Sequence, residues 1–201
     1  LYLSSYVYNH CHAHQTFRYD YKQTFHRNNL GLEELIDIYG LEYVEDIAKL
    51  LKKSPLTVNN DFDPQGNNDL TYCLHTEYKH FLIEIVCETF FTGNCFFPTE
   101  KTWRPIMLET PFVIQGPQWY LHRLKDLGFK TFDCWWDEGY AEDPADHQPK
   151  EIVKIIDYIK EKNIEKLNTM YNEMQPILKH NKKRFMELTS KDFEIFKNDH
   201  Y

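Results

Sequence analysis

Several common sequence features are absent from this chain. No apolar run reaches membrane-spanning length and no signal-peptide pattern is visible, so we expect no membrane association. The five cysteines are odd in number and include no CxxC pair, which favours a reducing compartment and argues against a disulfide framework or a zinc ribbon. Lys and Arg form no long block and the net charge is −8, so we do not expect a surface for duplex nucleic acid.

Short catalytic motifs are also lacking. The sequence contains no GxGxxG fingerprint, Walker loop, GxSxG or HExxH, so nothing supports a dehydrogenase, ATPase, serine hydrolase or zinc protease. The composition is typical of a globular protein: 42% of the 201 residues are hydrophobic and 27% are charged. Aromatic residues make up 16%, and such rings either pack a core or line sugar and nucleotide pockets.

Strand and helix patterns alternate along the chain. Four segments rich in apolar or β-forming residues are predicted strands: 1–8, 83–87, 112–115 and 129–132. Helical spacing predicts helices at 32–36 (ending at Gly40), 44–51, 119–127 and twice after Pro149. This order predicts an α/β fold with a Rossmann-like, mainly parallel sheet and flanking helices over residues 1–148, and C-terminal helices at 149–201 that pack on it.

The strongest chemical pattern surrounds the predicted strand at 83–87. Glu88 ends this strand, and Thr99-Glu100-Lys101 and Arg104 follow it. Ligands of open α/β sheets lie beyond the carboxyl ends of strands, near helix N-termini. Thr99 is a predicted N-cap that would place the first amides of a helix and Lys101 where a diphosphate could bind, with Glu100 available to ribose hydroxyls. The alternative interpretation is a capped helix with surface charges.

A family resemblance rests on residues 87–116, which read CETFFTGNCFFPTEKTWRPIMLETPFVIQG. This run resembles the donor-binding segment of glycosyltransferases with the two-Rossmann-domain (GT-B) fold, of the fucosyltransferase and exostosin type. Residues 121–140 (LHRLKDLGFKTFDCWWDEGY) look like glycosyltransferase-like proteins of tailed phages and other large DNA viruses, in which a His-Arg pair, here His26-Arg27, also precedes a helix. The turn at 116–119 (GPQW) is bulkier than the glycine-rich turn of many relatives.

The resemblance implies a donor site for a nucleotide-diphosphate sugar. Lys101 and Arg27 would hold the diphosphate, Glu100 the ribose, and Glu88 and Arg104 would belong to the same site. Both cations can bind one diphosphate only if their charged groups come within about 10 Å of each other. The implied reaction is inverting sugar transfer to an unknown acceptor, with no metal and no cofactor besides the donor.

The resemblance also leaves an alternative function. The general base of such enzymes lies in a separate N-terminal lobe that these residues do not supply, so the catalytic residues are unknown. The alternative is a non-catalytic viral structural or interaction protein that reuses the lobe, with other virion proteins or an upstream lobe as partners. The expected location is the cytoplasm of an infected host cell or the virion.

Three further patterns allow a functional and a structural interpretation. His10, His12 and His14 suggest a metal site or a solvated loop, and Asp61 and Asp63 suggest a metal-binding DxD or a turn. The segment 135–138 (WWDE) suggests an acceptor-sugar platform or core packing with an acidic rim. In each case we favour the structural interpretation, and we expect no metal to be needed for folding.

Overall fold

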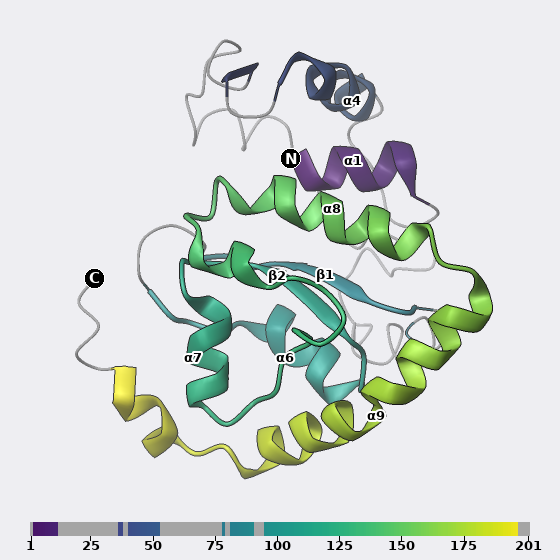
Figure 1. Ribbon diagram of the computed structural model, residues 1–201. Coiled ribbons are helices and arrows are strands. Elements are labelled where there is room, and N and C mark those ends of the chain that lie inside the picture. The colour runs from purple at the N-terminus through teal and green to yellow at the C-terminus, as the bar shows by residue number, and fades with distance from the viewer. Residues whose placement is uncertain are drawn as a thin grey trace, which may run out of the picture. The chain divides into compact units, whose positions relative to one another are not determined.

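The computed structural model (Figure 1) describes residues 2–11, 36–37, 40–52, 78, 81–90 and 95–196. The chain forms two compact units, residues 1–72 and 73–201. In the described part of the chain, no helix is long and apolar enough to cross a membrane.

Among the described residues of the first unit, the helices α1 (Tyr2–His10) and α4 (Leu41–Lys52) pack on each other. The helix predicted at 44–51 is therefore confirmed. Asp46 of α4 is almost fully buried, and its carboxylate Oδ2 lies 2.6 Å from Nε2 of His10 on α1. Gly40 has a φ of 88° and its amide bonds to the Ile36 carbonyl at 2.8 Å, which agrees with a helical turn ending at this glycine. Residues 32–35 of the helix predicted there lie outside the described part of the chain.

The prediction of a strand at residues 1–8 is wrong, because most of this segment is α1. Its Tyr, Val and Leu side chains have high β propensity, but propensity yields to tertiary packing. Leu3, Tyr6 and His10 are three and four positions apart and therefore share one helical face. The rings of Tyr6 and His10 stack with centroids 4.7 Å apart, so the helical spacing was the more informative pattern.

The second unit is a mixed α/β structure built on two parallel strands, β1 (Glu84–Cys87) and β2 (Phe112–Gln115). Glu84 pairs with Phe112 and Cys87 with Gln115, so both strands end at one edge. Both were predicted, and their pairing is parallel as expected. The helices are α6 (Glu100–Met107), α7 (Tyr120–Asp126), α8 (Gln148–Lys160) and α9 (Ile164–Glu187), with short 3-10 helices η2 (Gly139–Glu142) and η3 (Ser190–Phe196).

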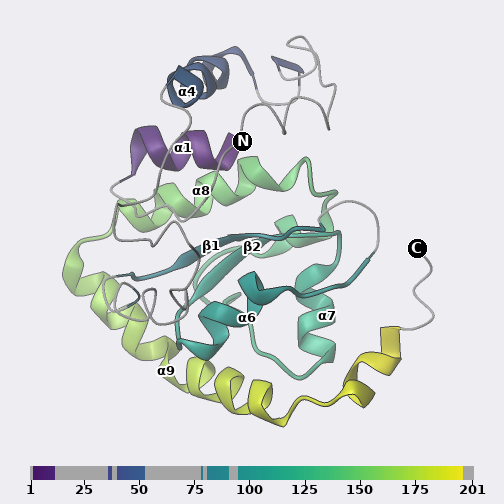
Figure 2. The ribbon, with the colours of Figure 1, turned by 180° about the vertical axis from the view of Figure 1, so that it is seen from behind.

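The helices of the second unit cover both faces of the strand pair. Figures 1 and 2 show α8 on one face and α6 and α7 on the other, while α9 runs along the outer side of α6. Apolar side chains of β2 and of the inner faces of α7 and α8 form the core, and the largest include Phe112, Ile114, Leu124 and Ile152. The helices at 119–127 and after Pro149 are confirmed by α7, α8 and α9.

The prediction of a strand at residues 129–132 is wrong: the segment joins no sheet. Its backbone is paired by a side chain instead. The amide of Asn181 on α9 accepts a hydrogen bond from the Lys130 N–H and donates one to the Lys130 carbonyl, both at 2.8 Å. Asn181 is 1% exposed. A buried carboxamide thus replaces the neighbouring strand that the apolar pattern led us to expect.

We predict that Asn181→Ala lowers the free energy of unfolding by about 1–3 kcal/mol, because the backbone N–H and C=O of Lys130 lose their part-buried partner, the Asn181 carboxamide. Urea unfolding measures this change. Lys179→Ala, an exposed position on the same helix, is the control and should shift the value by no more than about 0.5 kcal/mol. Equal stability of the two variants would contradict the assigned role of Asn181.

Candidate functional site

The carboxyl end of β1 is organised around the side chain of Glu88, which is 2% exposed. Its Oε1 accepts hydrogen bonds from the Thr99 amide at 3.0 Å and the Thr102 hydroxyl at 2.5 Å, and lies 3.1 Å from the Tyr120 hydroxyl. Its Oε2 accepts from the Thr99 hydroxyl at 2.6 Å and the Thr89 amide at 3.1 Å. One carboxylate therefore joins the end of β1 to the first turn of α6 and the first residue of α7.

Hydrogen bonding decides the charge of this carboxylate. Burial alone would raise the pKa of Glu88, but hydrogen bonds from Thr102, Thr99 and two backbone amides outweigh it and hold the pKa below its usual value. Burial and the neighbouring Glu88 charge raise the pKa of Tyr120 well above its ordinary value. At neutral pH the site therefore holds an ionised Glu88 against a neutral Tyr120.

The start of α6 presents two charged side chains to solvent. Thr99 is the N-cap, as predicted, and its hydroxyl accepts from the Lys101 amide at 3.3 Å. Glu100 is exposed, and its carboxylate has no partner among the residues that the structure describes. The Lys101 ammonium donates to the Thr89 hydroxyl at 2.9 Å in an exposed position. The structure thus brings Glu88, Glu100 and Lys101 together at the carboxyl end of β1.

Arg104 lies elsewhere. Its guanidinium forms an ion pair with Glu84, the first residue of β1, and its Nε donates to the Tyr78 hydroxyl at 2.5 Å. Burial alone would lower the pKa of Arg104, but the hydrogen bond and the charge of Glu84 raise it overall. Glu84 and Glu88 mark opposite ends of the strand. Arg104, one helical turn after Glu100, therefore contacts the amino end of β1 and is not brought to the carboxyl edge.

Other predicted residues lie outside the described part of the chain. These are Arg27, His12, His14, Asp61 and Asp63. The approach of Arg27 to Lys101 stays a prediction. Among the described residues, no three His, Cys, Asp or Glu side chains gather as metal ligands would, and the expectation of metal independence remains open.

The end of β2 contributes residues that sequence reasoning did not single out. The side chain of Gln148, 1% exposed at the start of α8, accepts from the Gly116 amide at 3.1 Å. Tyr120 packs so closely on Gly116 that a Cβ there would lie 3.0 Å from its ring. Trp119, between them, is 42% exposed and has a φ of 67°. The bulky turn in the sequence was the only signal for this arrangement.

Exposed aromatic side chains also follow β1. Phe90 and Phe97 are 55% and 57% exposed, and their rings meet edge to face with centroids 5.8 Å apart. In the segment 135–138, by contrast, Trp136 is buried against Phe132, with ring centroids 5.4 Å apart, while Asp137 is exposed. Core packing is therefore confirmed, but the acidic rim is Asp137 alone, because the side chain of Glu138 is 8% exposed and accepts a hydrogen bond from the Phe132 amide at 2.7 Å.

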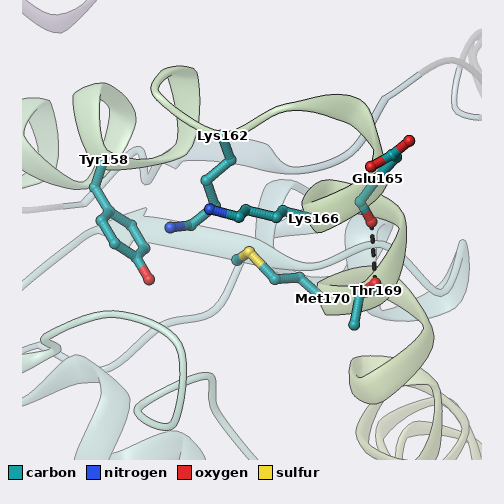
Figure 3. A pocket seen from close by; sticks show the side chains of 6 residues that line it. All are labelled: Tyr158, Lys162, Glu165, Lys166, Thr169 and Met170. Atoms are coloured by element: carbon teal, nitrogen blue, oxygen red, sulfur yellow. Dashed lines mark hydrogen bonds between the residues drawn. The ribbon is translucent and has the colours of Figure 1, made fainter.

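A shallow pocket of about 320 Å³ lies at the turn between α8 and α9 (Figure 3). Its lining residues are Tyr158, Lys162, Glu165, Lys166, Thr169 and Met170. The Lys162 ammonium lies 3.4 Å from the centroid of the Tyr158 ring, a cation–π contact that occupies part of the opening. No residue predicted from the sequence lines this pocket, so the carboxyl edge of the strand pair is the better candidate site.

Comparison with models of known protein families gives no match, and neither do searches of curated proteins and of solved structures. The functional interpretation therefore rests on the residues and their geometry.

We predict that Glu88→Gln lowers the free energy of unfolding at pH 7 by about 2–4 kcal/mol, because the amide cannot accept all the hydrogen bonds that the carboxylate accepts. The difference in free energy of unfolding between wild type and Glu88→Gln should become smaller at acidic pH. The pKa of Glu88 is lower in the folded protein than in the unfolded chain, where it is about 4.3. Its stabilisation is therefore complete above that value and is lost as the pH falls through the folded-state pKa.

Urea unfolding of wild type and Glu88→Gln from pH 7 to pH 3 measures this difference. Glu100→Gln is the matched control: it is exposed and unpaired among the described residues, so its loss of stability at pH 7 should be much smaller than that of Glu88→Gln. A Glu88→Gln deficit that stays constant with pH would show that ionisation of Glu88 does not stabilise the fold.

Proposed function

We propose that this chain is a glycosyltransferase-like lobe that binds a nucleotide-diphosphate sugar at the carboxyl end of β1. One observation carries the proposal. Glu100 and Lys101 begin a Thr99-capped helix directly beyond a parallel strand, with both charged groups facing solvent. Nucleotides bind α/β proteins at this position, because helix amides and a cation there meet the phosphates. The same proposal includes a Rossmann-like fold for this lobe.

Each exposed group has a role in this proposal. The Lys101 ammonium and the first turn of α6 stabilise negative charge on the diphosphate, which grows as the nucleoside diphosphate leaves the transferred sugar. The Glu100 carboxylate accepts hydrogen bonds from ribose hydroxyls. Glu88 is a positioning residue, because its oxygens are already occupied by Thr99, Thr102 and Tyr120. Arg27 is the proposed second phosphate ligand, and the general base belongs to another lobe.

A second candidate function is favoured by a different observation. Glu88 and Arg104, two of the predicted donor-site residues, are engaged in contacts within the fold. A lobe that keeps these contacts for stability alone would fit a non-catalytic structural or interaction protein, such as a virion component. Nucleotide binding separates the two candidates, because a purely structural lobe needs no diphosphate site.

We predict that wild type binds nucleoside diphosphates and that Lys101→Ala weakens this binding by about tenfold or more, since a charge-assisted hydrogen bond to phosphate is lost. Calorimetric titration with guanosine, uridine and thymidine diphosphates measures the change. Thermal stability should stay nearly constant, because the hydrogen bond from the Lys101 ammonium to Thr89 is exposed and contributes little to folding.

Lys154→Ala is the matched control. This lysine is 72% exposed on α8, pairs only with Glu151 in the described structure, and should leave nucleotide affinity unchanged. If wild type binds none of the three nucleotides, or if Lys101→Ala binds as tightly as wild type, donor recognition at this edge is wrong and the structural function becomes the better explanation.

A further inference from the structure

Trp119 combines two features that rarely occur together. Its backbone has φ 67° and ψ 15°, the left-handed conformation that residues other than Gly, Asn and Asp seldom adopt. Its side chain is nevertheless 42% exposed rather than packed in the core. A glycine would adopt this backbone without strain, so burial does not explain a large aromatic residue here.

The surrounding structure holds the strained turn firmly. The Trp119 amide donates to the Ala141 carbonyl at 2.6 Å, and the Gln118 side chain donates to the Glu142 carbonyl, also at 2.6 Å. The Gly116 amide is held by Gln148 at 3.1 Å. The indole also contacts the ring of His122 with centroids 5.1 Å apart and planes 72° apart. The backbone of the turn is therefore fixed, and the ring lies against His122 while much of its surface stays accessible.

Trp119 lies at the same edge as Glu100 and Lys101. It follows the carboxyl end of β2, the neighbour of β1 in parallel register. The next residue, Tyr120, approaches Glu88 at 3.1 Å and Thr102 at 2.8 Å, which fixes the turn against the first turn of α6. Lys101 and Trp119 therefore belong to segments that lie at the carboxyl ends of two neighbouring strands, the edge that the proposed nucleotide would occupy.

We infer that Trp119 is the stacking surface for the base of the bound nucleotide. This inference rests on the proposed function and adds its base-recognition residue. An exposed aromatic ring on a firmly held turn can stack on any nucleobase, because every base has a π face. The contact contributes affinity without selecting one base, whereas the phosphates bind at Lys101 independently of it.

The test compares nucleoside diphosphates with a ligand that has no base. Calorimetric titrations with guanosine diphosphate, uridine diphosphate and pyrophosphate are made on wild type, Trp119→Leu and Trp119→Phe. We expect Trp119→Leu to weaken both nucleotides by about tenfold and leave pyrophosphate unchanged, and Trp119→Phe to keep most of the affinity. Trp135→Leu, which changes another partly exposed tryptophan, is the control and should bind as wild type does.

A second variant separates a binding role from a packing role. Trp119→Gly removes the ring and relieves the left-handed backbone, so its melting temperature should stay level or rise while its nucleotide affinity falls as in Trp119→Leu. A lower melting temperature with unchanged nucleotide affinity would show that the ring serves packing and would overturn the inference.

The outcomes distinguish this inference from the proposed function. If wild type binds nucleotides but Trp119→Leu binds them equally well, the stacking role is wrong and the diphosphate site stands. If wild type binds nucleotides no better than pyrophosphate, the base is not recognised and the inference also fails. If wild type binds neither, the proposed function and the inference fail together.

Discussion

The second unit depends on one buried charge, the carboxylate of Glu88. An ionised carboxylate removed from water is costly unless hydrogen bonds replace its hydration. Here they come from residues 99, 102 and 120, and satisfying them fixes β1, α6 and α7 to one another. The position of Lys101 and the orientation of the Trp119 turn follow from this arrangement. In the proposed function, Glu88 is therefore a positioning residue that acts through the elements it holds together.

Much of this fold could be predicted from local patterns. The continuous apolar runs identified β1 and β2, and helical spacing identified α4, α7, α8 and α9. The two errors share a cause, since both segments owe their conformation to a distant partner. Residues 1–8 are mostly helical because one face packs on α4. Residues 129–132 need no neighbouring strand because Asn181, about fifty positions later, pairs with Lys130. The helical spacing of Leu3, Tyr6 and His10 was a local signal for the first segment, whereas nothing local to residues 129–132 points to Asn181.

The candidate site also contains residues that local patterns predicted correctly and residues whose role depends on distant partners. The cap at Thr99 is a local signal, so the placement of Glu100 and Lys101 in the first turn of α6 followed from the sequence. Glu88 and Arg104 were predicted to contact ligand, yet each is bound by residues far along the chain. Tyr120 is 32 positions from Glu88, and Tyr78 is 26 positions from Arg104. In the sequence, a charged residue that binds a ligand looks the same as one that pairs within the fold. The structure distinguishes them, because it shows the partner of each charge.

The central claim is that the carboxyl edge of the strand pair binds a nucleoside diphosphate. The most direct measurement is a titration of isotope-labelled protein with guanosine diphosphate, followed by amide and indole chemical shifts in nuclear magnetic resonance spectra. The account predicts that the amides of Glu100 and Lys101 and the indole N–H of Trp119 shift together and saturate at one ligand concentration. Saturating shifts confined to the pocket between Tyr158 and Met170, or no shifts at all, would contradict it.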